Sequence, residues 1–288
     1  MMRDLAFVWL QYMLPRHWLT ALVWRLARSR TPAIKNRLIG WFVRAFAVDV
    51  DEVRGSVPGD FATFNDFFVR ELQDDARPIA TDETSLVSPA DGTVSQAGEI
   101  RGDMVFQAKG IDYALDDLLA TDLDLAARLV DGSFATIYLA PCNYHRVHAP
   151  LTGELVAARY VPGDLFSVNQ ATVARIPGLF RRNERLVLHF DTRIGPVAVI
   201  LVGALNVGSI STPWTGEIRP RKTGLVEVLD ISGHPTTVMK GDLLGWFNMG
   251  STVILLLPPK TCDWNNDLEP GTTLRMGAGI GELRDIDG

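Results

Sequence analysis

The first 50 residues combine short apolar runs with single basic residues. Between residues 34 and 45 the apolar positions recur at intervals of three and four, the spacing of one face of an α-helix. Pro15 ends the first apolar run, and Thr31-Pro32 is typical of a helix cap followed by a first helical residue. The pattern predicts two or three short amphipathic helices within residues 1–48.

From residue 86 onward, short runs rich in β-branched and aromatic residues alternate with Gly, Pro and Asp, which predicts strands and turns. The runs cover residues 93–98, 134–140, 153–161, 185–191, 196–210, 225–232 and 251–257. Residues 61–72 carry a helical pattern with an aromatic face, and residues 112–130 predict a helical insertion. The predicted fold class is α+β: a mainly antiparallel β catalytic body, residues 49–288, preceded by amphipathic helices.

Charge separates these two regions. The whole chain has a formal net charge of -6, but residues 1–50 contain eight basic and two acidic residues, together with four of the seven tryptophans. Basic side chains beside tryptophan suit a helix that lies in the lipid headgroup layer. The longest uncharged run here, residues 5–15, has eleven residues, and a spanning helix needs about 20. We therefore expect peripheral contact with an anionic membrane, the alternative being helices that only pack on the body. The acidic total argues against nucleic acid as a partner.

Two of the five histidines, His145 and His148, lie in the segment PCNYHRVHAP after a predicted strand. Three residues apart, they share a face in a helical turn and point to opposite faces in an extended segment. No second ligand cluster accompanies them, so no metal site is predicted. We expect one to be a catalytic base and the other to be structural, while His189 belongs to a strand core.

Asp91 and Ser251 complete the candidate chemistry. Asp91 lies in SPADG, where an Asp-Gly pair usually only forms a turn. Ser251 follows Gly250 and precedes an apolar strand that would hold its hydroxyl still, although Gly-Ser pairs occur three more times in the chain. No phosphate-binding loop, dinucleotide fingerprint or G-x-S-x-G motif is present. The residues alone indicate Asp–His–Ser chemistry on an amphiphilic substrate.

Ten segments, in order, resemble the bacterial membrane-type phosphatidylserine decarboxylases over nearly the whole chain. They are LQYMLPRHWLT (10–20), FNDFFVREL (64–72), ARPI (76–79), SPADG (88–92), QAKG (107–110), YHRVHAP (144–150), YVPGDLFSVN (160–169), LFRRNER (179–185), ILVGALNVGSI (200–210) and MGSTVI (249–254). One departure is Met249, where the family usually has leucine, a residue of similar size and polarity.

The resemblance implies a proenzyme that cuts itself between Gly250 and Ser251, giving a beta chain of residues 1–250 and an alpha chain of residues 251–288. In this scheme the Ser251 hydroxyl attacks the Gly250 carbonyl, His148 accepts its proton and Asp91 orients the imidazole. Ser251 then becomes a covalent pyruvoyl group, which is the cofactor.

The resemblance also implies that phosphatidylserine is decarboxylated to phosphatidylethanolamine, with the pyruvoyl group as electron sink. His148 is the leading proton donor and Tyr144–His145 the alternative. Residues 161–169 resemble the substrate-binding loop, so His145, Phe166 and Ser167 are candidate substrate contacts. The expected assembly is a homodimer, peripheral on the cytoplasmic face of the cytoplasmic membrane. Two rival readings remain: a membrane-associated serine hydrolase that uses the same triad uncut, and a membrane-docked β module without activity.

Overall fold

The computed structural model describes residues 2–108, 110–120, 122–206 and 209–284. Lys109 and residues 207–208, which belong to two of the ten resemblance segments, and residues 285–288 of the predicted alpha chain lie outside the described residues. The N-terminal region forms three helices, α1 (Met2–Met13), α2 (Arg16–Ala27) and α3 (Pro32–Phe46). Pro32 is in the first turn of α3 as predicted, but the Thr31 side chain makes no capping hydrogen bond. No helix in the described ranges is long and apolar enough to cross a bilayer.

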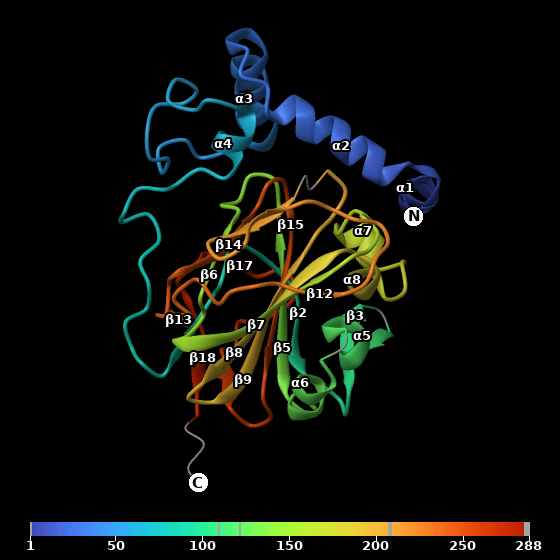
Figure 1. Cartoon of the computed structure of the whole chain (residues 1–288), viewed down its shortest axis with the longest axis vertical. Coiled ribbons are helices and arrows are strands. Elements are labelled where there is room, and N and C mark those ends of the chain that lie inside the picture. The colour runs from blue at the N-terminus through green and yellow to red at the C-terminus, as the bar shows by residue number, and fades with distance from the viewer. Residues whose placement is uncertain (1, 109, 121, 207–208, 285–288) are drawn as a thin grey trace.

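The body is built around one nine-stranded antiparallel sheet (Figure 1). Its order is β12 (Glu227–Val228), β7 (Gly153–Val161), β8 (Arg185–Thr192), β9 (Gly195–Val202), β15 (Ser251–Leu257), β5 (Ser133–Leu139), β2 (Gly92–Glu99) and β17 (Thr273–Leu274), with β13 (Thr237–Val238) also paired to β7. Its central strands are buried on both faces, which explains their continuous apolar runs. The predicted α+β class is confirmed.

Smaller elements surround this sheet. A four-stranded sheet contains β11 (Gly216–Ile218), β10 (Ile210–Thr212), β14 (Leu243–Phe247) and β6 (Arg146–His148), and a three-stranded sheet contains β1 (Ser85–Val87), β18 (Gly279–Leu283) and β16 (Cys262–Trp264). The hairpin β3 (Met104–Ala108) and β4 (Ile111–Ala114) leads into the short helices α5 (Leu115–Leu119) and α6 (Leu123–Arg128). Two more short helices, α7 (Gln170–Val173) and α8 (Leu179–Arg182), precede β8.

Four predicted boundaries differ from the structure. Only Phe64–Phe68 (α4) of the helix predicted over residues 61–72 is helical, and beyond its end the Arg70 side chain donates to the carbonyls of Cys142 and Asn143. The insertion predicted over 112–130 begins as strand β4, which pairs with β3. The run 196–210 leaves the sheet after β9, and only two residues of 225–232 pair as a strand.

An aromatic cluster joins the N-terminal helices to the body. Phe42 of α3 makes edge-on contacts with Phe64, Phe67 and Phe68 of α4, at ring-centre distances of 5.1, 6.4 and 5.7 Å. Such pairs stabilise a contact by about 1 kcal/mol beyond the area they bury. The cluster therefore takes side chains from both sides of the predicted boundary after residue 48.

The strand register brings the candidate site to one edge of the main sheet. Ser251, at the start of β15, lies opposite Leu139, at the end of β5. Thr93 near the start of β2 and Thr252 both lie opposite Tyr138. The ends of β7 and β9 and the start of β8 lie at this edge too, since Arg185 pairs with both Val161 and Val202. In Figure 1, helices α1–α3 lie above this edge.

Candidate active site

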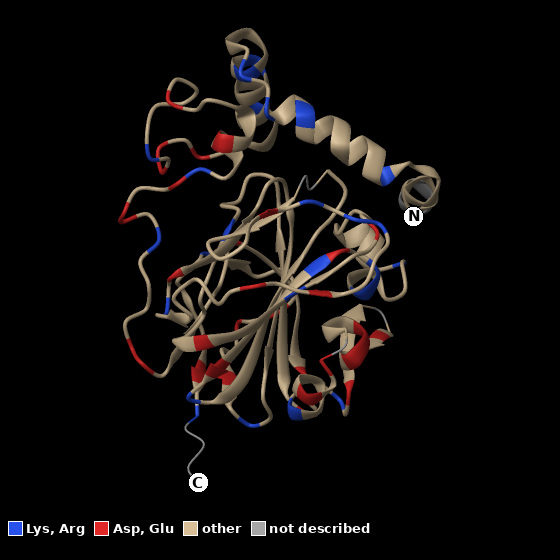
Figure 2. Cartoon of the chain, in the orientation of Figure 1, with Lys and Arg blue, Asp and Glu red and all other residues tan. Residues whose placement is uncertain are grey.

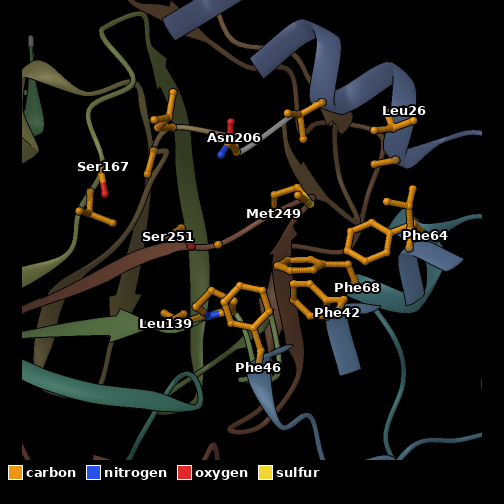
Figure 3. Close-up of a pocket in the computed structure, with 18 of the residues that line it drawn as sticks. Leu26, Phe42, Phe46, Phe64, Phe68, Leu139, Ser167, Asn206, Met249 and Ser251 are labelled. Carbon is orange, nitrogen blue, oxygen red and sulfur yellow. The ribbon is translucent and has the colours of Figure 1, made fainter. Parts of the chain in front are cut away.

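An apolar cavity of about 420 Å³ lies between the N-terminal helices and this edge of the sheet. One wall is formed by side chains of α2, α3 and α4, which include Leu26, Trp41, Phe42, Phe64 and Phe68. The other wall contains Ser167, Asn206, Met249, Gly250 and Ser251. Figure 3 shows Ser251 between Ser167 on one side and Met249 and Phe68 on the other. Among the described residues that line the cavity, none is charged, so the site favours an apolar or amphiphilic ligand.

Ser251 is held rigidly with its hydroxyl unused. The residue is fully buried, and its strand is paired on both sides, to β5 and to β9. Within the described part of the chain, its Oγ has no hydrogen-bond partner. A buried hydroxyl without a partner is uncommon, because it loses its hydration without compensation. The residue therefore fits the role of a nucleophile better than a structural one.

Gly250 leaves the approach to the Gly250–Ser251 bond open. A Cβ built at this glycine would lie 3.6 Å from the Leu139 oxygen and 3.7 Å from His145 Cε1, both ordinary contacts. The imidazole of His145 is thus a direct neighbour of the candidate scissile bond. The Ser251 hydroxyl, which is next to the Gly250 carbonyl and has no partner among the described residues, fits a prosthetic group made from Ser251 itself.

His145 is fully buried and stacks on Phe68, with ring centres 4.1 Å apart. Its Nε2 lies 3.4 Å from the Pro141 carbonyl, whereas Nδ1 has no partner among the described residues. Burial, reinforced by the nearby Arg70 guanidinium, lowers the pKa of His145 to about 3. The ring is therefore neutral, and a proton on Nε2 leaves Nδ1 as a free acceptor.

His148 lies in β6 and has both ring nitrogens occupied. Nδ1 is 2.8 Å from the Gly241 carbonyl, to which it donates, so Nε2 accepts from the Tyr144 hydroxyl at 3.2 Å. Burial lowers the pKa of His148, although the Gly241 carbonyl opposes that shift. Because β6 is extended, His145 and His148 face different partners, as the extended alternative predicted.

Asp91 is bound by an arginine. Its carboxylate accepts from Arg77 Nε at 2.8 Å and Nη2 at 2.6 Å, and from the Met276 backbone N–H at 2.9 Å. Arg77 also pairs with Glu52 at 2.9 Å. Arg77 lies in the ARPI segment, but nothing in the sequence pattern assigned it to Asp91.

The predicted triad residues share one edge of the sheet without touching. Across the described residues, no hydrogen bond joins Asp91, His148 and Ser251 to one another. β2 and β15 flank β5 in register, so Asp91 and Ser251 are about two strand spacings, or roughly 10 Å, apart. His148 lies beside the Asp91 turn, because its N–H donates to Pro89 O at 2.8 Å.

The two substrate-loop candidates occupy different surroundings. Ser167 lines the cavity, whereas Phe166 is buried outside it, with the Arg16 and Arg182 guanidinium groups 3.9 and 4.6 Å from its ring centre. Asn206, which the sequence did not single out, also lines the cavity and has a backbone φ of 69°. An asparagine within the predicted strand run 196–210 could have marked this position, because asparagine tolerates the left-handed conformation that ends a strand.

Two other sequence expectations concern histidine. His189 lies in β8 as predicted, but its side chain is partly exposed and 3.7 Å from Asp122. In the described ranges no group of three or more His, Cys, Asp and Glu side chains is arranged to hold a metal ion.

Together, these features define an α+β enzyme in which an apolar cavity ends on a buried serine. A family model described as phosphatidylserine decarboxylase matches residues 64–282, and a second, described as PSD, matches residues 6–47. The chain belongs to the phosphatidylserine decarboxylase family and is an enzyme of that family, which confirms the resemblance noted in the sequence.

Full-length relatives agree with these matches. The phosphatidylserine decarboxylase proenzyme of Alcanivorax borkumensis is 48% identical over 281 residues, which cover 97% of each chain. The proenzyme of Saccharophagus degradans is 46% identical and covers 98% of this chain and 99% of its own. The Pseudomonas aeruginosa proenzyme is also 46% identical, over 96% of each chain.

Proposed function

We propose that this enzyme decarboxylates phosphatidylserine to phosphatidylethanolamine, using a pyruvoyl group made from Ser251. The observation that carries the proposal is the buried, unpartnered Ser251 hydroxyl next to Gly250 at the end of an apolar cavity. Family membership and the word proenzyme in the relatives' names support it.

The group would arise by self-cleavage. Ser251 Oγ attacks the Gly250 carbonyl carbon, its proton passes through a base to the departing Ser251 nitrogen, and the amide becomes an ester. Loss of the Ser251 Cα proton then expels Gly250 as a carboxylate and leaves a dehydroalanine. Water converts that residue to pyruvoyl and ammonia. Pairing of β15 to two neighbours supports this step, since it fixes the nucleophile while residues 248–250 remain outside the strand.

His148 and Asp91 are the base and orienting carboxylate that we propose for cleavage. Their location at the edge that contains Ser251 supports this, because the segment that carries His148 continues from β5, between β2 and β15. To act as the base, His148 must give up the hydrogen bond of its Nε2 with the Tyr144 hydroxyl and form one with the Ser251 hydroxyl instead. We assign to His145 the contact with substrate, supported by its unpaired Nδ1 and its closeness to Gly250.

In decarboxylation the pyruvoyl carbonyl supplies the electron sink. The chain's own residues would bind the lipid and control water. The aromatic wall of α3 and α4 excludes solvent, and the Ser167 hydroxyl and Asn206 amide offer hydrogen bonds to the polar headgroup. The unprotonated Nδ1 of His145 can accept a hydrogen bond from the substrate and orient it.

The amphiphilic substrate requires contact with a bilayer, and α1–α3 are suited to it. Trp9, Trp18 and Trp41 are 66, 65 and 56% exposed. Figure 2 shows Lys and Arg along these helices, whereas most Asp and Glu lie in the body. We propose peripheral binding to anionic lipid on the cytoplasmic face of the cytoplasmic membrane, with a homodimer as the assembled form.

Intact-protein mass spectrometry, combined with an assay of carbon dioxide release from phosphatidylserine vesicles, tests the proposal. We expect two chains that meet at Gly250 and Ser251, the smaller one blocked at its N-terminus. Ser251→Ala should remain a single chain and release no carbon dioxide. An active, uncut parent protein would refute the pyruvoyl mechanism, and release of fatty acid instead would favour the serine hydrolase.

A further inference from the structure

Helices α1 and α2 contact the loops that form the cavity wall. Gln11 is buried, and its Oε1 accepts a hydrogen bond from the Ser167 backbone N–H at 3.1 Å. Arg16 pairs with Asp164 at 2.9 Å and covers the Phe166 ring. The loop between β7 and α7 has no regular structure, and the Asn183 side chain of the body bonds to both backbone groups of Phe166, so the helices and the body hold the loop together.

The second cavity loop is bound by α2, the helix that also contains Arg16. Thr20 of α2 is buried, and its hydroxyl accepts from the Asn206 N–H at 3.2 Å. Asn206 has a left-handed backbone, a conformation that persists only where neighbouring contacts hold it. Buried polar side chains of the N-terminal helices thus bond to both residues, Ser167 and Asn206, that offer polar groups to the cavity.

We propose that Gln11, Arg16 and Thr20 form a latch that positions the substrate-binding loops of this decarboxylase. The three residues do not touch the reacting atoms and act through Ser167 and Asn206. The proposal deepens the proposed function and rests on it for the identity of the substrate. The helices would therefore serve both to contact the membrane and to shape the site.

Helices α1 and α2 can combine membrane contact with positioning of the loops because different sides of them are exposed and buried. Trp9, Met13 and Trp18 are exposed, whereas Gln11 and Thr20 face the body and are buried. Lipid binding on one side can therefore stabilise the latch on the other without competing for the same residues. Without the latch, only a fraction of the molecules would hold the competent loop, and apparent substrate affinity would fall by that fraction.

Gln11→Ala is the sharpest test, because it removes the acceptor for Ser167. We expect complete self-cleavage, a KM for phosphatidylserine raised about tenfold and a kcat within about twofold of the parent. A short-chain phosphatidylserine kept below its critical micelle concentration should show the same rise as vesicles. Hydrogen exchange at the Ser167 amide should accelerate. Gln11→Glu retains an acceptor and should restore most of the KM.

Gln170→Ala is the matched control. This glutamine is exposed in α7, three residues beyond Ser167, and its side chain makes no hydrogen bond among the described residues. Its KM and Ser167 exchange should equal those of the parent. A Gln11→Ala effect on vesicles alone, or unchanged Ser167 exchange, would overturn the latch. If the parent protein releases no carbon dioxide, the proposed function fails, and the exchange experiment still decides whether the latch exists.

Discussion

The two sides of the sheet edge differ in whether their buried polar side chains have hydrogen-bond partners. On the side of Asp91 and His148, each of these side chains is bonded, to Arg77 and Met276 in one case and to Tyr144 and Gly241 in the other. On the side of Ser251, its Oγ has no partner among the described residues, and neither has Nδ1 of His145, which lies beside Gly250 without lining the cavity. Burial without a hydrogen bond costs about 1–3 kcal/mol per group, so a ligand that bonds to either of these atoms would recover that cost.

The solvent on the two sides differs as well. A polar cleft of about 290 Å³ lies on the side of Asp91 and His148, and its lining includes Arg77, Tyr144 and Arg146. The cavity that ends on Ser251 has no charged lining among its described residues. The Arg77 and Tyr144 side chains that bond to Asp91 and His148 therefore line a polar space, while the lipid headgroup would enter an apolar one. Under the proposed function, we expect cleavage to depend on His148 and decarboxylation on His145.

Of the variants considered, His148→Ala and His145→Ala should show the largest difference between the two sides of the sheet edge. We expect His148→Ala to slow self-cleavage by about 10²–10⁴-fold, the usual effect of losing a general base. His145→Ala should be cleaved but should lose a similar factor in carbon dioxide release per cleaved chain. Intact mass and lyase activity, measured on the same samples, distinguish the two. Identical behaviour of both variants would mean that one imidazole serves both reactions.

Removing Arg77 tests whether Asp91 depends on its ion pair with this arginine. Arg77→Met leaves Asp91 buried without its cation, which should lower the free energy of unfolding by about 3–5 kcal/mol and slow cleavage. Arg54→Met is the matched control, because Arg54 is half-exposed and forms surface ion pairs with Glu71 and Asp74. Its loss should cost below about 1 kcal/mol. Urea unfolding measures both, and equal losses would show that Asp91 does not depend on Arg77.

How much of this could be predicted from sequence depends on the length of each element. Strands β5, β9 and β15 were predicted because their runs of β-branched and aliphatic residues exceed what a turn contains. β6 and β14, with three and five residues, were missed, since pairing with neighbours rather than periodicity makes them strands. The aromatic pattern of residues 61–72 was misleading because those rings pack inward around a bend.

The candidate site was predictable in its members but not in its contacts. Motif resemblance marked Asp91, His148 and Ser251, and the register brings them to one edge. The sequence could not give the Arg77 pair or the closeness of His145 to Gly250, because both depend on the loops that follow β5 and precede β1. Side-chain partners in irregular segments are decided by tertiary packing, which local pattern does not encode.

Glu184 provides the last test, since it is a buried carboxyl at the same edge without the paired arginine that Asp91 has. Its Oε2 accepts from the Tyr160 hydroxyl at 2.7 Å, and Oε1 has no partner among the described residues. Burial raises the pKa of Glu184 to about 8, against the opposing effect of the Tyr160 hydrogen bond. The folded protein thus retains a proton that the unfolded chain releases near 4.5, the ordinary pKa of a glutamate.

Its contribution to stability is therefore fully present below about pH 4.5 and is lost as the pH rises through about 8. Glu184→Gln keeps an acceptor for Tyr160 and removes the titration. The difference in unfolding free energy between variant and parent should grow in favour of the variant by up to about 5 kcal/mol between pH 5 and 9. Urea unfolding of both proteins across this range measures the difference, and parallel pH curves would mean that Glu184 is ionised in the folded protein.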